Sequence, residues 1–437
     1  MNKYYIETLG CPKNEYDSEV LKNILENNGY EETQIIVDAK YIIVNTCGFI
    51  NDAKVESIDK IFDMIRIKND DVLLIVTGCL SKRYHKELSV EMPEVDLFIG
   101  VDEYYRLPEI IDNLPKERYY IEPFKKEPIP YLTRKIPDNT YSTTIKIAEG
   151  CNNACAFCII PKIRGPFRSK SIEDIIKEAE YLVSIGTKEI TLIAQDVTYY
   201  GKDIYGKYML TELLYELDKV DGLEWIRLMY CYEERITDKL IDAIANIDKI
   251  CKYIDIPIQH ISDNVLKKMN RASTEESIKL TIKKLRKKVQ GIRIRTTLLV
   301  GFPGETEEDY DKLVDFVEQT KFDRLGVFAF SNEEDTKAFK MPNHIDEEVK
   351  KQRVDGIMSR QVDISLNNNK KMIGNTYTIL VEEKDLTDDS YIGRTEYDAK
   401  EIDNSVLFKS ENELKPGDMV KVKILDAYDY DLVGEEA

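Results

Sequence analysis

Three apolar runs near the start of the chain, each rich in β-branched residues, lead directly into a cysteine. The runs are KYYIETLG before Cys11, YIIVNT before Cys47 and VLLIVTG before Cys79. A fourth run, LFIG, covers residues 97–100, and helix-like stretches separate the four. One of these stretches, SEVLKNILENNG (18–29), is expected to begin at Ser18 and to end at Gly29. Continuous apolar strands that alternate with helices predict a parallel sheet covered on both faces.

The positions of these cysteines predict that their thiols meet. Sites in a parallel sheet gather beyond the carboxyl ends of its strands, and neighbouring strands lie about 4.8 Å apart. Cys11, Cys47 and Cys79 would therefore lie at one edge. Three converging thiolates can hold an iron–sulfur cluster, and a set of three leaves one iron open to another ligand. Buried core cysteines are the alternative, because free thiols are common in protein interiors.

A second alternation of strand and helix patterns starts at residue 143. Its strand-like runs are TTIKIAEG (143–150), EITLIAQD (189–196), EWIRLMYC (224–231), YIDIPIQH (253–260), RIRTTLLVG (293–301) and RLGVFAFS (324–331). About six such units are too few for a closed eight-stranded barrel. They predict an open, partial α/β barrel that has its site at the carboxyl edge of the strands.

A compact cysteine motif follows the first of these runs. It has the pattern C-x3-C-x2-C and comprises Cys151, Cys155 and Cys158. A zinc site is the alternative, but structural zinc usually takes four ligands. The histidines His85, His260 and His344 are all remote in sequence. Three thiolates in so short a segment again favour an iron–sulfur cluster with one open iron.

The last part of the chain follows another pattern. The polar stretch IDEEVKKQRVDGIMSRQVDISLNNNKKM predicts a connecting helix, and short period-two runs beyond Gly374 predict a small β-barrel of OB-like type. We therefore expect three domains, at 1–135, 136–372 and 373–437, and a linker at 101–140. Residues 373–437 hold 7 basic and 17 acidic residues, a net charge of -10 out of -19 for the whole chain.

The composition indicates the cellular setting. No apolar run approaches the roughly 18 residues of a membrane span, and the start MNKYYIETLG lacks the apolar stretch of a signal peptide. Eight cysteines without a secretion signal favour a reducing compartment, where thiols ligate metals more often than they form disulfides. We expect a soluble cytoplasmic protein with no membrane partner.

Several segments resemble the methylthiotransferase family of radical S-adenosylmethionine enzymes. They are LGCPKNEYDSE, AEGCNNACAFCIIPKIRG, IPIQHISDNVLKKMNR, RTTLLVGFPGETEEDY and EYDAKEIDNSV, and they extend over essentially the whole chain. Within the family, the sequences of these segments are most similar to the members that modify an aspartate of protein twelve of the small ribosomal subunit. The resemblance implies an α/β fold with an N-terminal doubly wound parallel-sheet domain, a central partial barrel and a C-terminal barrel called TRAM.

The resemblance also implies the cofactors and the reaction. Cys151, Cys155 and Cys158 would hold one 4Fe–4S cluster whose open iron binds S-adenosylmethionine. The three N-terminal cysteines would hold an auxiliary 4Fe–4S cluster. Such a transferase adds a methylthio group to the β-carbon of the target aspartate, uses two S-adenosylmethionine molecules per turnover and needs an electron donor. That C–H bond is unactivated, so the cofactors carry the difficult step while the protein positions them.

Seven further residues are candidates for cofactor binding. They are Phe157, Gln195, Asp196, Gln259, Arg293, Arg295 and Gly301. Phe157 precedes the last motif cysteine, as in the family. Gln195, Asp196 and Gln259 end strands of the predicted barrel. The two arginines open a strand and can pair a carboxylate bidentately. The glycine permits close backbone approach, and a helix cap is the alternative role for the polar strand ends.

Two other functions remain open. A sibling enzyme places the same group on an adenosine of transfer RNA, but a barrel that grips RNA should be basic. Because residues 373–437 are acidic, we expect no stable nucleic-acid binding there and a basic ribosomal protein as substrate. The non-enzymatic alternative is an iron–sulfur electron carrier or a ribosome-binding module, although a fully ligated cluster would serve a carrier better than an open iron.

Overall fold

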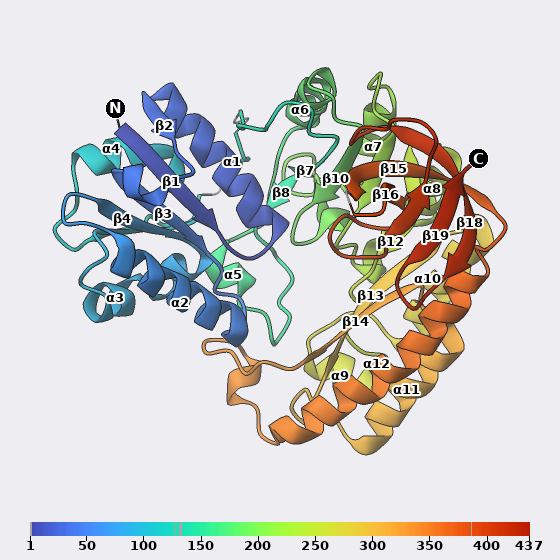
Figure 1. Cartoon of the computed structure of the whole chain (residues 1–437). Coiled ribbons are helices and arrows are strands. Elements are labelled where there is room, and N and C mark those ends of the chain that lie inside the picture. Colours follow the sequence, from blue (N-terminus) through green and yellow to red (C-terminus); the bar gives the residue numbers. More distant parts are fainter. Residues whose placement is uncertain (1, 126, 131–132, 386) are drawn as a thin grey trace.

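The computed structural model describes residues 2–125, 127–130, 133–385 and 387–437. Figure 1 shows an N-terminal α/β part in blue, a central part in green to orange and a C-terminal barrel in red. The central part contacts both of the others, since α1 lies against β7 and the red barrel forms ion pairs with β10. No helix within the described ranges is long and apolar enough to cross a bilayer.

The N-terminal sheet is parallel throughout and has the strand order β2-β1-β3-β4-β5-β6. Its strands are β1 (Asn2–Thr8), β2 (Tyr30–Glu32), β3 (Tyr41–Thr46), β4 (Leu73–Gly78), β5 (Leu97–Ile99) and β6 (Tyr119–Tyr120). Its helices are α1 (Pro12–Asn27), α2 (Asn51–Ile67), α3 (Cys79–Glu91) and α4 (Leu107–Asp112).

Alternating side chains of β3 explain why both faces of this sheet are covered. Ile42 and Val44 pack with α2 and α3 on one face, whereas Tyr41 and Ile43 pack with α1 and α4 on the other. Figure 1 shows helices on both sides of this sheet. Successive residues of a strand point to opposite faces, so an uninterrupted apolar run needs helices on both sides. The predicted doubly wound domain is confirmed.

Two predictions for this domain were wrong in detail. Helix α1 begins at Pro12 rather than Ser18, because proline at the first helical position has a backbone angle already suited to a helix. Ser18 lies buried inside the helix, where its hydroxyl contacts Thr8 and accepts from the Asn45 amide. The predicted linker at 101–140 contains α4 and β6, and its residues 126 and 131–132 lie outside the described ranges.

The central sheet is open and parallel, and its strands are neighbours in chain order. They are β7 (Ser142–Lys146), β10 (Glu189–Ile193), β11 (Trp225–Leu228), β12 (Ile250–Asp255), β13 (Arg293–Val300) and β14 (Arg324–Ala329). The helices are α5 (Ile160–Ile163), α6 (Ile172–Ser184), α7 (Leu210–Asp218), α8 (Asp238–Asn246), α9 (Asp263–Lys268), α10 (Glu275–Lys288) and α11 (Glu307–Thr320). The predicted partial barrel is confirmed.

Short elements in the connections complete the first two parts. A small antiparallel pair, β8 (Ala148–Glu149) with β9 (Arg168–Ser169), closes the loop that carries the C-x3-C-x2-C motif. Single 3-10 turns are η1 (Ile36–Asp38), η2 (Tyr104–Arg106), η3 (Val197–Tyr199), η4 (Glu233–Arg235) and η5 (Ala338–Lys340). The pairing of β8 with β9 was not predicted, because two-residue strands leave no period in the sequence.

Helix α12 (Glu347–Lys370) leads into the C-terminal barrel and confirms the predicted connecting helix. The barrel is closed in the order β15-β16-β17-β19-β18. Its strands are β15 (Thr376–Asp385), β16 (Ser390–Thr395), β17 (Val406–Lys409), β18 (Met419–Ala427) and β19 (Leu432–Glu436). Alternate side chains such as Val406 and Phe408 fill its interior, as the period-two runs predicted.

A buried ion network fastens this barrel to the central sheet. Glu189 of β10 accepts hydrogen bonds from Arg394 of β16 and, at 2.8 Å, from Arg227 of β11. Burial alone would raise the pKa of the Glu189 carboxyl, but the two guanidinium groups lower it from 4.5 to about 2. The carboxylate is therefore charged and fully paired at neutral pH.

We expect Glu189→Gln to lower the free energy of unfolding by about 3–5 kcal/mol, because it leaves the buried Arg227 without its carboxylate partner and Arg394 with Glu382 alone. Chemical unfolding of both variants measures this. Since the folded-state pKa of Glu189 is depressed, its contribution is present above pH 4.5 and is lost as the pH falls toward 2.

Glu216→Gln is the matched control for that substitution. Glu216 pairs with Lys219 on an exposed helix face, where an ion pair contributes about 0.3–0.5 kcal/mol. Equal losses in the two variants, or no loss for Glu189→Gln, would contradict the role given to the buried network.

Candidate active site

The three N-terminal cysteines lie at the carboxyl edge of the first sheet. Cys11 follows β1 and caps α1, Cys47 follows β3, and Cys79 follows β4 as the first residue of α3. Strands β1 and β3 are neighbours, and the helices that follow them lie on opposite faces of the sheet. This is a topological switch point, the position at which open α/β sheets bind ligands.

Close backbone approach brings these thiols together. A Cβ at Gly10, whose φ is +96°, would lie 2.8 Å from the Cys47 Cβ and 3.1 Å from its Sγ. A Cβ at Gly48 would likewise lie 2.7 Å from the Leu80 Cα, next to Cys79. Only glycine permits these approaches. Burial, together with the nearby Cys11 and Cys47, raises the pKa of the Cys79 thiol to about 12 against the opposing charge of Arg164.

The C-x3-C-x2-C loop is held at several backbone points. The Cys151 N–H donates to the Gly165 carbonyl at 3.1 Å, and the Ala156 N–H donates to the Met269 carbonyl at 2.8 Å. Burial raises the pKa of Cys151 to about 11, with Cys155 adding to the shift. Burial also raises the pKa of Cys158, and its two partner thiols raise it further. The three thiols of the loop therefore lie near enough to affect one another electrostatically.

Polar side chains from the barrel support this loop. Asp196 accepts from the Asn153 amide and from Arg235, each at 2.8 Å, and Asn153 lies between the first two motif cysteines. The Tyr232 hydroxyl lies 3.7 Å from the Cys155 Sγ, and the Arg271 guanidinium lies 4.2 Å from the centre of the Tyr232 ring. Tyr232, Arg235 and Arg271 were not predicted, because isolated polar residues carry no pattern.

Residues close in sequence to the two cysteine sets come together in the tertiary structure. Cys79 packs in a single apolar cluster with Ile159, the residue after Cys158, and with Ile163 of α5. A cavity of about 720 Å³ lies nearby, and a site of this size suits a small organic ligand. It is lined on one side by residues that follow Cys47 and on the other by the carboxyl ends of barrel strands. The lining includes Phe49, Asn51, Asp52, Phe157, Gln259, Thr297, Leu299, Phe328 and Glu333.

Some of the seven predicted cofactor contacts reach this region. Phe157 and Gln259 line the cavity, and Gln259 has a left-handed backbone with φ of +69°. Such a conformation costs a non-glycine residue about 1–3 kcal/mol and is concentrated at ligand sites. Gln195 donates to Glu149 at 2.7 Å, and Asp196 supports the motif loop.

Arg293, Arg295 and Gly301, the other three predicted cofactor contacts, do not line the cavity. Arg293 and Arg295 stand at the amino end of β13, where they pair at 2.9 Å with Asp323 and Asp255. A Cβ at Gly301 would lie 2.3 Å from the Lys350 Cγ, so this glycine makes room for α12. The structure does not bring these three residues to the cavity.

The donor sets fit iron–sulfur clusters. Each set supplies three thiols in a glycine-lined or loop-bound cradle, and each thiol of a 4Fe–4S cluster binds a different iron. The thiols therefore need not stand as close as the ligands of one ion. No group of three Cys, His, Asp or Glu side chains at single-ion spacing occurs in the part of the chain that the structure describes.

Comparisons with known families cover all three parts of the chain. Residues 3–100 match a family described as uncharacterized protein family UPF0004. Residues 145–317 match the radical SAM superfamily, and residues 373–436 match the TRAM domain. Together with the two cysteine sets, these matches define a radical SAM enzyme with a TRAM barrel.

Full-length relatives narrow this class. A ribosomal protein uS12 methylthiotransferase RimO of Clostridioides difficile is 50% identical over 442 residues, which cover 100% of this chain and 99% of that protein. Proteins of the same name from Clostridium botulinum and Geotalea uraniireducens are each 47% identical, over 99% of this chain and 97% and 98% of theirs. The chain belongs to the RimO family of methylthiotransferases.

Solved structures share the fold at low identity. The radical S-adenosylmethionine methyltransferase TsrM from Kitasatospora setae superposes with a TM-score of 0.59 at 15% identity, over 75% of this chain and 73% of that chain. The cobalamin-dependent S-adenosylmethionine radical enzyme OxsB superposes with a TM-score of 0.52 at 13% identity, over 83% and 56%. These likenesses support the architecture of an α/β domain joined to a radical SAM barrel.

The three N-terminal cysteines are predicted to hold iron, and we expect Gly10→Ala to reduce the iron bound by well over half, because the new Cβ displaces Cys47. Iron and sulfide analysis after anaerobic reconstitution measures this, in a chain whose Cys151, Cys155 and Cys158 are alanines. Gly29→Ala is the matched control, because Gly29 also has a positive φ, of +82°, but a Cβ there meets nothing within 4 Å. Equal iron in the two variants would show that the close approach does not shape the site.

Proposed function

We propose that this protein adds a methylthio group to the β-carbon of an aspartate of ribosomal protein uS12. The proposal is supported by a cavity that residues close in sequence to Cys47 and Cys158 line, in a chain that matches uS12 methylthiotransferases from end to end. We further propose that 1–135, 136–372 and 373–437 are its domains and that it acts in the cytoplasm, where ribosomes are assembled.

The two cysteine sets have distinct roles in this proposal. Cys151, Cys155 and Cys158 would hold a 4Fe–4S cluster with S-adenosylmethionine on its open iron, and Cys11, Cys47 and Cys79 would hold a second 4Fe–4S cluster. When bound, these groups supply the radical that removes a hydrogen from the target carbon and the methylated sulfur that replaces it. An external electron donor is also required.

The side chains around the cavity would bind and orient the cofactor and the substrate and would exclude water from them. Phe157 and Leu299 give the cavity apolar walls, which keep water from a reactive centre. Gln259 presents an amide that can orient a polar group of the cofactor. Phe49 and Phe328 are 37% and 53% exposed at the same cavity, and exposed apolar side chains beside a pocket suit contact with a substrate segment. The substrate segment would enter beside these two rings.

A protein substrate is favoured by the names of the full-length relatives and by the net charge of residues 373–437. The full-length relatives are named for uS12, so the alternative of a transfer RNA substrate is not favoured. The net charge of -10 on residues 373–437 repels phosphate and attracts a basic protein. An electron carrier, the non-enzymatic alternative, needs neither an open iron nor a ligand cavity.

The cluster count is tested by removing each cysteine set as a unit. The reconstituted wild-type protein should bind about eight irons, and each triple alanine variant about four, because each set holds one four-iron cluster. Cys231→Ala/Cys251→Ala is the control, since these two buried cysteines belong to neither set. About four irons in the wild-type protein would contradict the auxiliary cluster.

The substrate is tested with reconstituted protein, S-adenosylmethionine and dithionite, offered either uS12 or transfer RNA. We expect uS12 to gain one methylthio group in place of a hydrogen on an aspartate, and tandem mass spectrometry locates it. Either triple cysteine variant should abolish this gain. Modification of transfer RNA without modification of uS12 would overturn the proposed substrate.

A further inference from the structure

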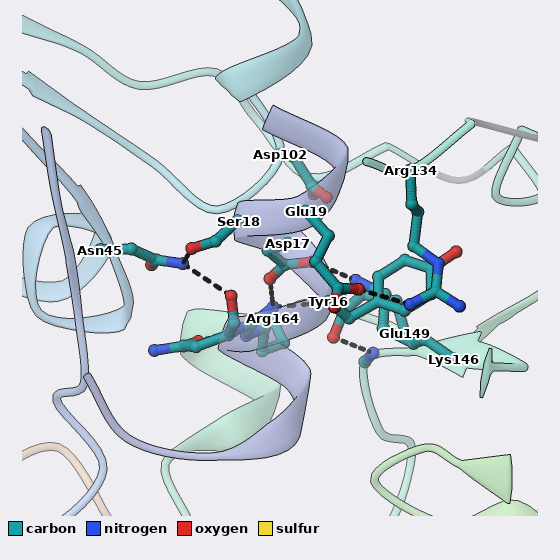
Figure 2. Close-up of polar contacts among 12 residues, drawn as sticks. Tyr16, Asp17, Ser18, Glu19, Asn45, Asp102, Arg134, Lys146, Glu149 and Arg164 are labelled. Carbon is teal, nitrogen blue, oxygen red and sulfur yellow. Dashed lines mark hydrogen bonds and ion pairs between the residues drawn. The ribbon is translucent and has the colours of Figure 1, made fainter. Parts of the chain in front are cut away.

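Arg164 lies at the centre of a buried polar network between the first two parts of the chain. Its side chain is 2% exposed and follows α5 of the central part. Figure 2 shows it pointing toward Asp17 on α1 of the N-terminal part. One terminal nitrogen, Nη1, donates to Asp17 at 2.6 Å and to Glu149 at 3.0 Å.

The other terminal nitrogen reaches the first cysteine set. Arg164 Nη2 donates to the Asn14 Oδ1 at 2.5 Å and to the Cys79 Sγ at 3.4 Å. Asn14 itself is fixed, because its amide donates to the carbonyls of Leu9 and Thr46. The guanidinium is therefore held on all sides while one of its N–H groups points at a sulfur.

The neighbouring residue reaches the second cysteine set. The Gly165 carbonyl accepts the Cys151 N–H at 3.1 Å, and Glu149, a partner of Arg164, accepts the Gly150 N–H at 3.1 Å. Arg164 and Gly165, which are consecutive in the chain, thus contact one cysteine from each set. A shift of this segment would move both Cys79 and Cys151.

The charges of the network explain the use of arginine. Lys146 and Arg164 face Asp17 and Glu149, so the four groups balance. Lys146 binds the same two carboxylates as Arg164, but its described contacts do not include a cysteine. The planar fork of arginine can serve two carboxylates, an amide and a sulfur at once, which a lysine ammonium cannot.

We infer that Arg164 is a positioning residue that sets the reduction potential of the cluster held by Cys11, Cys47 and Cys79 through its hydrogen bond to the Cys79 sulfur. This inference rests on the proposed function, which places a cluster there. A hydrogen bond to a ligating sulfur, and a nearby positive charge, stabilise the more negative, reduced cluster. Removing both should make the potential more negative.

The test uses the full chain with Cys151, Cys155 and Cys158 replaced by alanine, so that a single cluster is observed. Its midpoint potential is measured by dithionite titration followed by electron paramagnetic resonance. We expect Arg164→Gln to shift the one-electron reduction equilibrium at least tenfold toward the oxidised form, a shift of about 59 mV to more negative potential. Arg164→Lys should give a smaller shift in the same direction.

Two further variants separate the hydrogen bond from the rest of the network. Arg164→Gln combined with Asp17→Asn restores the charge balance, protects folding and should keep the negative shift. Lys146→Gln removes the other cation without removing a described cysteine contact and should shift the potential much less. An unchanged potential in both Arg164→Gln chains, or an equal shift in Lys146→Gln, would overturn the inference.

The outcomes also separate this inference from the proposed function. If the chain with only the N-terminal cysteines binds no iron, the proposed auxiliary cluster and the inference both fail. If it binds a cluster whose potential does not depend on Arg164, only the inference fails.

Discussion

The buried ion network around Arg164 joins the two halves of the site, and the rest of the geometry depends on it. Asp17 and Asn14 come from α1, whereas Lys146, Glu149 and Arg164 come from the central part. Burying four charges is costly unless every one is paired, and losing one partner of such a set typically costs about 3–5 kcal/mol. The network therefore selects one arrangement of the two sheets, and in that arrangement residues close in sequence to Cys47 and Cys158 line one cavity.

Buried, paired charges also join the central sheet to the C-terminal barrel. Glu189 holds Arg227 of its own sheet and Arg394 of the C-terminal barrel, so a carboxylate at the amino end of β10 fastens the barrel there. Arg295 and Asp403 add a second link between these parts at 3.7 Å. The acidic barrel is thus fixed at the amino ends of the central strands, whereas the cavity lies at their carboxyl ends.

Much of the fold and part of the site follow from local pattern. Cys11, Cys47 and Cys79 were placed at one sheet edge because apolar runs of strand length precede each of them, and the structure puts them at that edge. The start of α1 was placed too late, because Ser18 is a good helix cap in isolation but here is buried against Thr8. The cofactor role of Arg293 was predicted only from its place in a strand, and in the structure its guanidinium pairs with Asp323.

The sequence by itself determined the two alternating strand–helix series, the period-two barrel and the six cysteines, since each depends on spacing along the chain. Tertiary structure alone decided that residues close in sequence to Cys47 and Cys158 line one cavity and that Arg164 contacts Cys79, 85 residues away. A polar residue without a period gives no local signal, because its partners are chosen by the packing of separate sheets and not by its neighbours in sequence.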